Sequence, residues 1–93
     1  MTQQNPVTTP QIAMIHTVSG LIPLFDGLVK QHLPQWQSFN TLDESLLRGT
    51  IRDGALSQST MWRLAQMVHS AVKAGASAAV VTCSTLGPAV DAT

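Results

Sequence analysis

Cys83, the only cysteine of the 93-residue chain, is the side chain best suited to nucleophilic or proton-transfer chemistry. It follows the apolar run 78–82 and precedes Pro88, a residue typical of the first position of a helix. The dipole and unpaired N–H groups of a helix start lower the pKa of a nearby thiol. The same N–H groups, with the hydroxyls of Ser84 and Thr85, can hold a carboxylate or phosphate. The sequence therefore predicts a reactive thiol beside an anion site, with a small buried hydrophobic cysteine as the alternative.

His16 and Thr17 are the second pair of candidates. They end the apolar run 12–15, which is typical of a strand buried on both faces. Ligands of open α/β sheets bind beyond the carboxyl ends of the strands. We therefore expect His16 and Thr17 to lie beside Cys83. The alternative is that His16 has only a structural role, as a hydrogen-bonded residue at the end of its strand.

The charged residues between the second strand and the next helix are weaker candidates. Asp43 and Glu44 are adjacent carboxylates that point in different directions, which disfavours an acid–base pair. Arg48 and Arg52 are expected to be solvated, with a substrate carboxylate as their less favoured partner.

The composition limits the classes of function. Hydrophobic residues make up 44% of the chain and charged residues 11%, which predicts one packed domain. Five Lys and Arg balance five Asp and Glu, without the basic runs of nucleic-acid or membrane-surface binders. One cysteine excludes an internal disulfide, and the three histidines are too far apart in the sequence to predict a metal site. With no signal peptide or membrane span, a cytoplasmic protein is expected.

The elements that must position Cys83 follow from hydrophobic spacing. A helix is predicted from residue 21 until Pro34 stops it, and a second over 61–72 with Gly75 just past its end. Strands are predicted over 12–16, over 36–42 at a sheet edge, and over 78–82 in a buried position. Residues 43–57 are predicted to be a mobile loop or a short helix.

These elements predict an α/β fold with a three-stranded parallel sheet. Right-handed crossovers give the strand order 2-1-3, with helices on both faces. Residues 1–10 are expected to be a flexible tail, and residues 11–93 a single flavodoxin-like domain truncated within its third helix. Without that helix, apolar residues over 12–15 and 78–81 are expected to face water. Self-association or marginal stability should follow.

Three segments resemble the aspartate/glutamate racemase superfamily. They are Ile-Ala-Met-Ile-His-Thr (12–17), Thr-Leu-Asp-Glu-Ser-Leu (41–46) and Val-Thr-Cys-Ser-Thr-Leu-Gly-Pro (81–88). The similarity covers residues 11–93 and corresponds to the N-terminal half of that fold. The Thr-Cys-Ser turn after a buried strand is its most specific part.

The resemblance implies cofactor-independent isomerisation at the carbon alpha to a carboxylate. In the superfamily two similar domains each supply one cysteine, and one thiolate removes the proton while the other thiol delivers one to the opposite face. Cys83 matches the first cysteine, and Ser84 and Thr85 match substrate-carboxylate positions. His16 and Thr17 stand where racemases carry an Asp-Ser or Asn-containing pair, and Ser84 stands where amino-acid racemases have Asn.

The expected substrate is thus a small carboxylate, and no cofactor is implied. The chain alone is expected to be inactive unless a second domain or another copy of the chain in a homo-oligomer completes the site. Two alternatives remain open. One is a related decarboxylase or cis-trans isomerase of dicarboxylates, and the other is a non-catalytic flavodoxin-like module that binds a small anion or a partner.

Overall fold

The computed structural model describes residues 9–83 and residue 86, which form an α/β fold around one parallel sheet. The strands are β1 (Gln11–His16), β2 (Gln37–Leu42) and β3 (Ala78–Val81), in the order β2-β1-β3. β1 is parallel to both neighbours. The predicted fold class, a three-stranded parallel sheet of order 2-1-3 with helices on both faces, is confirmed.

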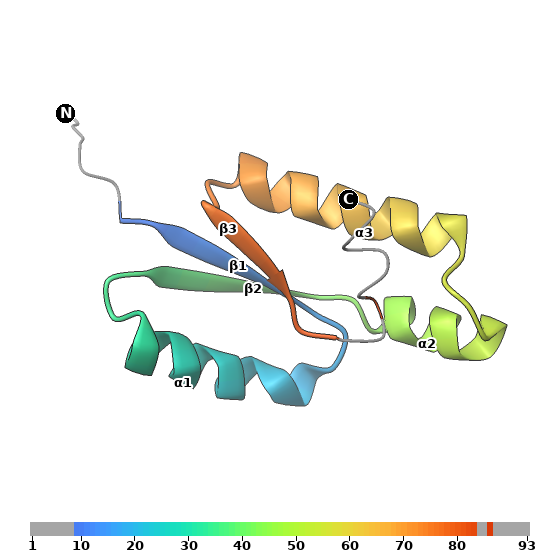
Figure 1. The fold of residues 1–93 in the computed structure, drawn as a ribbon, viewed down its shortest axis with the longest axis horizontal. Helices are drawn as coiled ribbons and strands as arrows, with labels where there is room; N and C mark the ends of the chain where they lie inside the picture. Colours follow the sequence, from blue (N-terminus) through green and yellow to red (C-terminus); the bar gives the residue numbers. More distant parts are fainter. Residues whose placement is uncertain (1–8, 84–85, 87–93) are drawn as a thin grey trace.

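Three helices surround this sheet. α1 (Ile22–His32) covers one face and α3 (Gln58–Lys73) covers the other, while α2 (Glu44–Asp53) lies at the carboxyl end of the strands (Figure 1). The short 3₁₀ helix Ser19–Leu21 leads into α1. None of the helices in the described ranges is long and apolar enough to cross a membrane.

The helix limits follow from local residue chemistry. Pro23 lies in the first turn of α1, where its missing N–H is not needed. Ser57 caps α3 by accepting the backbone N–H of Thr60 at 3.0 Å. Gly75 follows α3 with a φ of +105°, a conformation that side-chain-bearing residues rarely adopt. The predicted position of Gly75 just past the helix is confirmed.

The central strand β1 separates two apolar clusters. Ile12 and Met14 pack with Val29 of α1 on one face. Ile15 packs with Leu46 of α2 and Leu64 of α3 on the other. Residues 12–15 are at most 7% exposed, so the expectation that this part of the sheet faces water is wrong.

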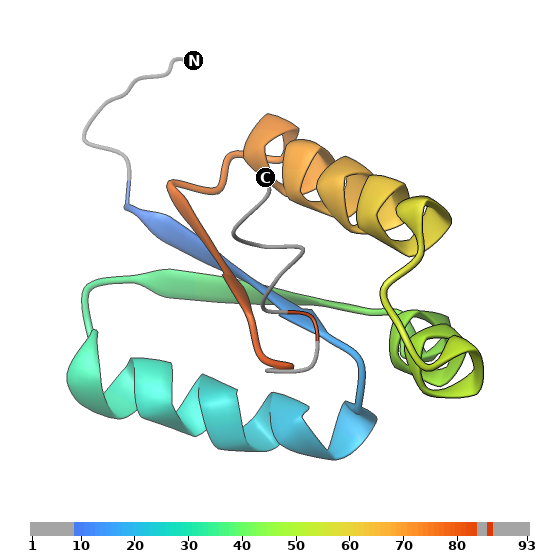
Figure 2. The same cartoon turned by 45° about the vertical axis from the view of Figure 1, so that its right-hand side comes forward.

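The third strand was expected to be buried, and this is also wrong. Ala78, Ala79 and Val80 are exposed, because β3 is an edge strand and no described element pairs with its outer side. Its apolar sequence is typical of a buried parallel strand, but burial also requires neighbours. In Figure 2 β3 (orange) passes in front of the other two strands, and the strand order places it at the edge of the sheet, beside β1. The predicted exposure of 78–81 thus holds for its first three residues.

Two further segments differ from the sequence-based expectation or extend beyond it. Residues 44–53 form the regular helix α2, so the short-helix alternative holds and the mobile loop does not. Of the predicted flexible tail, residues 1–8 lie outside the described residues. Pro10 is tied to the sheet, since its carbonyl accepts the N–H of Gln37 at 3.0 Å. The helix predicted from Pro88 also lies outside the described residues.

Candidate functional site

Cys83 lies at the carboxyl end of β3, next to the end of β1. Ile15 pairs with Val81 in the sheet, and the N–H of Thr82 donates to the carbonyl of Ile15 at 3.0 Å. Thr17 and Cys83 both follow the paired parts of β1 and β3, so both lie at the carboxyl end of the sheet. Cys83 is half-buried and packs against the cluster that contains Ile15, on the α3 face.

Thr17 carries a buried hydroxyl group. The residue is 3% exposed, and none of the residues that the structure describes forms a hydrogen bond with its Oγ1. A buried polar group without a partner is costly and is found mainly where a ligand, water or strained geometry explains it. This hydroxyl of Thr17 and the thiol of Cys83 lie at the same end of the sheet, after neighbouring strands.

His16 points to the opposite face, toward α1. It is fully buried, and its ring lies 6.0 Å from that of Phe25 between centroids. Its Nδ1 lies 2.8 Å from Oγ1 of Thr82, and its Nε2 lies 2.7 Å from Oδ1 of Asn40. The amide oxygen of Asn40 can only accept, so Nε2 donates to it, and in neutral His16 the hydroxyl of Thr82 donates to Nδ1.

The hydrogen-bond network continues beyond His16 to helix α1. The side-chain amide of Asn40 donates to Oδ1 of Asp26 at 3.0 Å, and the hydroxyl of Ser38 donates to the same oxygen at 3.2 Å. The network joins all three strand ends to α1. The structure therefore places Thr17 and Cys83 at the same end of neighbouring strands, and it directs the His16 side chain toward Thr82 and Asn40 on the α1 face.

The carboxylate of Asp43 caps helix α2. Its Oδ1 accepts the N–H of Ser45 at 2.9 Å and the Ser45 hydroxyl, while Oδ2 accepts from Nη2 of Arg63. The hydrogen bond from the Ser45 hydroxyl is the main cause that holds the pKa of Asp43 below its usual value. Burial opposes it, and the Ser45 N–H and the Arg63 guanidinium lower the pKa further. A carboxylate held ionised in this way is a poor general acid.

The other charged candidates are solvated. Arg48 pairs with Glu44 one turn away at 3.3 Å, and its side chain is 77% exposed. Arg52 pairs with Asp53 at 2.9 Å and is 76% exposed. The prediction of a solvated pair of arginines is confirmed, on a helix rather than in a loop.

Sequence analysis missed the network around His16. Asn40 alternates with apolar residues along β2, a pattern that is usually typical of a solvent-facing position. Asp26 lies within a predicted helix, and nothing in its sequence context indicated that it joins this network. Arg63, which joins α3 to the start of α2, was hidden within a predicted amphipathic helix.

Two of the predicted substrate-binding residues, Ser84 and Thr85, lie outside the described residues. Within ranges 9–83 and 86, no three His, Cys, Asp or Glu side chains gather closely enough to hold a metal ion. Comparison with protein-family models, curated proteins and solved structures gave no match.

Proposed function

We propose that the chain supplies one side of the active site of a cofactor-independent isomerase similar to the aspartate/glutamate racemases. The observation that carries the proposal is that Cys83 and Thr17, whose buried hydroxyl has no hydrogen-bond partner among the described residues, both follow adjacent parallel strands at the carboxyl end of the sheet. This end of an open α/β sheet is where such folds bind ligands.

The proposed chemistry starts with the thiolate of Cys83. Its sulfur takes the proton from the carbon alpha to the substrate carboxylate, and the electron pair of the broken C–H bond delocalises into the carboxylate as an enediolate. The hydroxyl of Thr17 donates a hydrogen bond to a carboxylate oxygen, where negative charge grows. Ser84 and Thr85 take the same role through the resemblance.

Inversion requires a second acid on the opposite face of the substrate. The sequence contains only one cysteine, so the second thiol must come from another domain or another copy of the chain. Alone, the chain should bind a small carboxylate without inverting its configuration. A cytoplasmic location belongs to the same proposal, since a catalytic thiol must stay reduced.

His16 acts indirectly in this proposal. Both of its ring nitrogens are hydrogen-bonded, to Thr82 and Asn40, and its side chain lies on the face away from the thiol. Because Thr82 directly precedes Cys83, His16 positions the end of β3 rather than the substrate.

A non-catalytic binding module is the second candidate function. Cys83 packs against an apolar cluster with Ile15, Leu46 and Leu64, which is an ordinary environment for a structural cysteine. An inert thiol would favour this reading.

The test is alkylation of Cys83 by iodoacetamide, followed by mass spectrometry across pH, with and without aspartate, glutamate or similar dicarboxylates. We expect a midpoint below the ordinary thiol value of about 8.5 and slower alkylation when a carboxylate is bound. The Thr17→Val variant should keep the midpoint and lose the protection. A midpoint at or above about 8.5, or no protection by any acid, would refute the activated-thiol proposal.

A further inference from the structure

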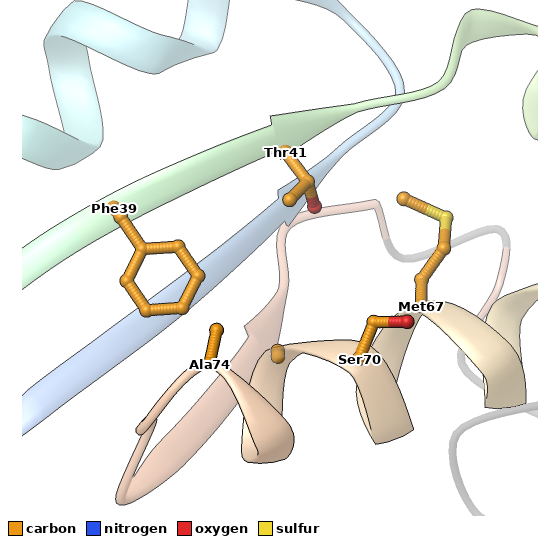
Figure 3. A pocket seen from close by; sticks show the side chains of 6 residues that line it. Phe39, Thr41, Met67, Ser70 and Ala74 are labelled. Carbon is orange, nitrogen blue, oxygen red and sulfur yellow. The ribbon is translucent and has the colours of Figure 1, made fainter.

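Alternation along β2 places two of its polar side chains against helix α1. Phe39 and Thr41 extend toward α3, where they line a pocket (Figure 3), so Ser38 and Asn40 face α1. On that face both donate to the same oxygen of Asp26, a partly buried carboxylate of α1. Because Asn40 also bonds to the ring at the end of β1, it connects α1 with the strand ends.

The carboxylate of Asp26 determines which way the amide of Asn40 points. An ionised carboxylate only accepts hydrogen bonds, so Nδ2 of Asn40 is the atom that donates to it, at 3.0 Å. Oδ1 of Asn40 is then directed at Nε2 of His16, 2.7 Å away. Turning the amide over would bring two oxygens together at Asp26 and break that bond. The position of the amide oxygen is therefore set from α1.

The oxygen of Asn40 in turn selects the tautomer of His16. A neutral ring donates to this oxygen only if its proton is on Nε2. Nδ1 is then unprotonated and accepts from the hydroxyl of Thr82 at 2.8 Å. In the other neutral tautomer Nδ1 would donate to Thr82, whose hydroxyl would turn to the carbonyl of Ile15 at 3.4 Å. Nε2 would then face the Asn40 oxygen with no proton between them.

We propose that Asp26 is a positioning residue for the end of β3. Through Asn40 it fixes the proton of His16 on Nε2, and this makes the hydroxyl of Thr82 a donor to His16. Thr82 directly precedes Cys83, so a carboxylate on α1 orients the residue next to the thiol. The inference rests on the proposed function only for the role of Cys83, because the hydrogen-bond order itself needs no reactive thiol.

The site of the proton on His16 is measured by long-range proton–nitrogen NMR correlation of the full chain in mildly alkaline solution, where an ordinary imidazole is neutral. In the unaltered chain we expect Nε2 to resonate as a protonated nitrogen and Nδ1 as an unprotonated one. His32 and His69 are exposed and serve as internal references, whose resonances should not change in any variant. A proton on Nδ1 of His16 in the unaltered chain would overturn the proposal.

A matched pair of variants shows whether Asp26 selects the tautomer. Asp26→Asn keeps the size and an acceptor for Ser38, but its amide can pair with either orientation of Asn40. The Nδ1 and Nε2 resonances of His16 should therefore move toward each other as the second tautomer becomes populated. Ser38→Ala removes the other donor to the same oxygen of Asp26 and should leave the His16 spectrum unchanged. An unchanged spectrum in Asp26→Asn, or an equal change in Ser38→Ala, would contradict selection by Asp26.

The other end of the network is tested at β3. Thr82→Val removes the donor to Nδ1 at nearly constant volume, and the imidazole proton should stay on Nε2, because the oxygen of Asn40 still faces it. The backbone amide resonance of Cys83 should shift in Asp26→Asn and stay in place in Ser38→Ala. A proton that moves to Nδ1 in Thr82→Val, or a Cys83 amide that does not respond to Asp26→Asn, would overturn the positioning role. Neither measurement depends on thiol reactivity, so failure here is distinguishable from failure of the alkylation test.

Discussion

His16 links two strands through both nitrogens of one imidazole ring. Replacing it by Ala removes the partner of Asn40 Oδ1, leaves the Thr82 hydroxyl only its longer bond of 3.4 Å to the carbonyl of Ile15, and opens a cavity. We expect His16→Ala to lower the free energy of unfolding by about 3–5 kcal/mol, measured by urea denaturation. The exposed His69 is the matched control, and its Ala variant should stay within about 0.5 kcal/mol of the unaltered chain. Equal midpoints for the two variants would show that the network does not stabilise the sheet.

Replacing Thr17 by Val should raise the stability of the fold and weaken the binding of carboxylates. Oγ1 of Thr17 is buried and has no hydrogen-bond partner among residues 9–83 and 86, so Thr17→Val removes an unsatisfied group at nearly constant volume. We expect the variant to be more stable by about 1 kcal/mol, and to lose the protection of Cys83 by carboxylates. Thr50 is the matched control, because its hydroxyl donates to the carbonyl of Leu46 at 2.9 Å. Thr50→Val should therefore be less stable than the unaltered chain. A destabilised Thr17→Val would mean that the hydroxyl is satisfied in the native state.

At the residue scale the sequence predicted which side chains end the strands, but not which face each one takes. His16, Thr17 and Cys83 were expected together because strands one and three are neighbours. Alternation along the strands sends His16 to the α1 face and Cys83 to the α3 face. That outcome depends on register, which is set by pairing between segments more than sixty residues apart.

At the scale of elements, α2 begins with a cap that depends on charge. Asp43→Ala removes the acceptor of the Ser45 N–H and the partner of Arg63, which should lower stability by about 1–2 kcal/mol near neutral pH. The fold lowers the pKa of Asp43, so its ionised form stabilises the fold above the unfolded pKa of about 3.9. This contribution is lost as the pH falls through the lower, folded value.

The expected observation is a stability difference between Asp43→Ala and the unaltered chain that is constant above about pH 5 and shrinks in more acidic solution. Urea denaturation across this pH range measures it. Asp53 is the exposed comparison. Arg52 also lowers the pKa of Asp53, but solvent screens this pair, so Asp53→Ala should change the stability in acid less than Asp43→Ala does. If Asp43→Ala lowered the free energy of unfolding equally at every pH, the effect would come from the capping hydrogen bond and not from the charge of Asp43.

The elements were predictable where local chemistry decides them. Pro34 and Gly75 end the segments that contain α1 and α3, and hydrophobic spacing within each helix indicates its buried side. α2 was ambiguous because Gly49 lies in its middle and lowers helix propensity. Packing compensates, since Gly49 is buried and Leu46 is fully enclosed between the sheet and α3. Whether an edge strand such as β3 is buried depends on the elements that lie beyond it. The residues of the strand itself do not indicate those elements.

At the scale of the whole molecule, one margin of the sheet is open and uncharged. β3 exposes Ala78, Ala79 and Val80, and no described strand pairs with its outer side. Beside it, a groove of about 270 Å³ between α1 and the sheet is lined by apolar side chains and His32. Natural edge strands usually carry a lysine, a proline or a bulge that discourages pairing with another chain. This one has none of these within its four residues.

We therefore expect the chain to self-associate through β3, and Ala79→Lys to reduce that association by placing a charge on the edge. Sedimentation velocity over a wide range of protein concentration measures both proteins. The matched control is Ile51→Lys, which adds the same charge in place of a residue that is 69% exposed on α2. The control should associate as the unaltered chain does, because α2 lies away from the β3 edge. If both substitutions weakened self-association equally, net charge would govern it. If the unaltered chain stayed monomeric, the open edge of β3 would be tolerated in solution.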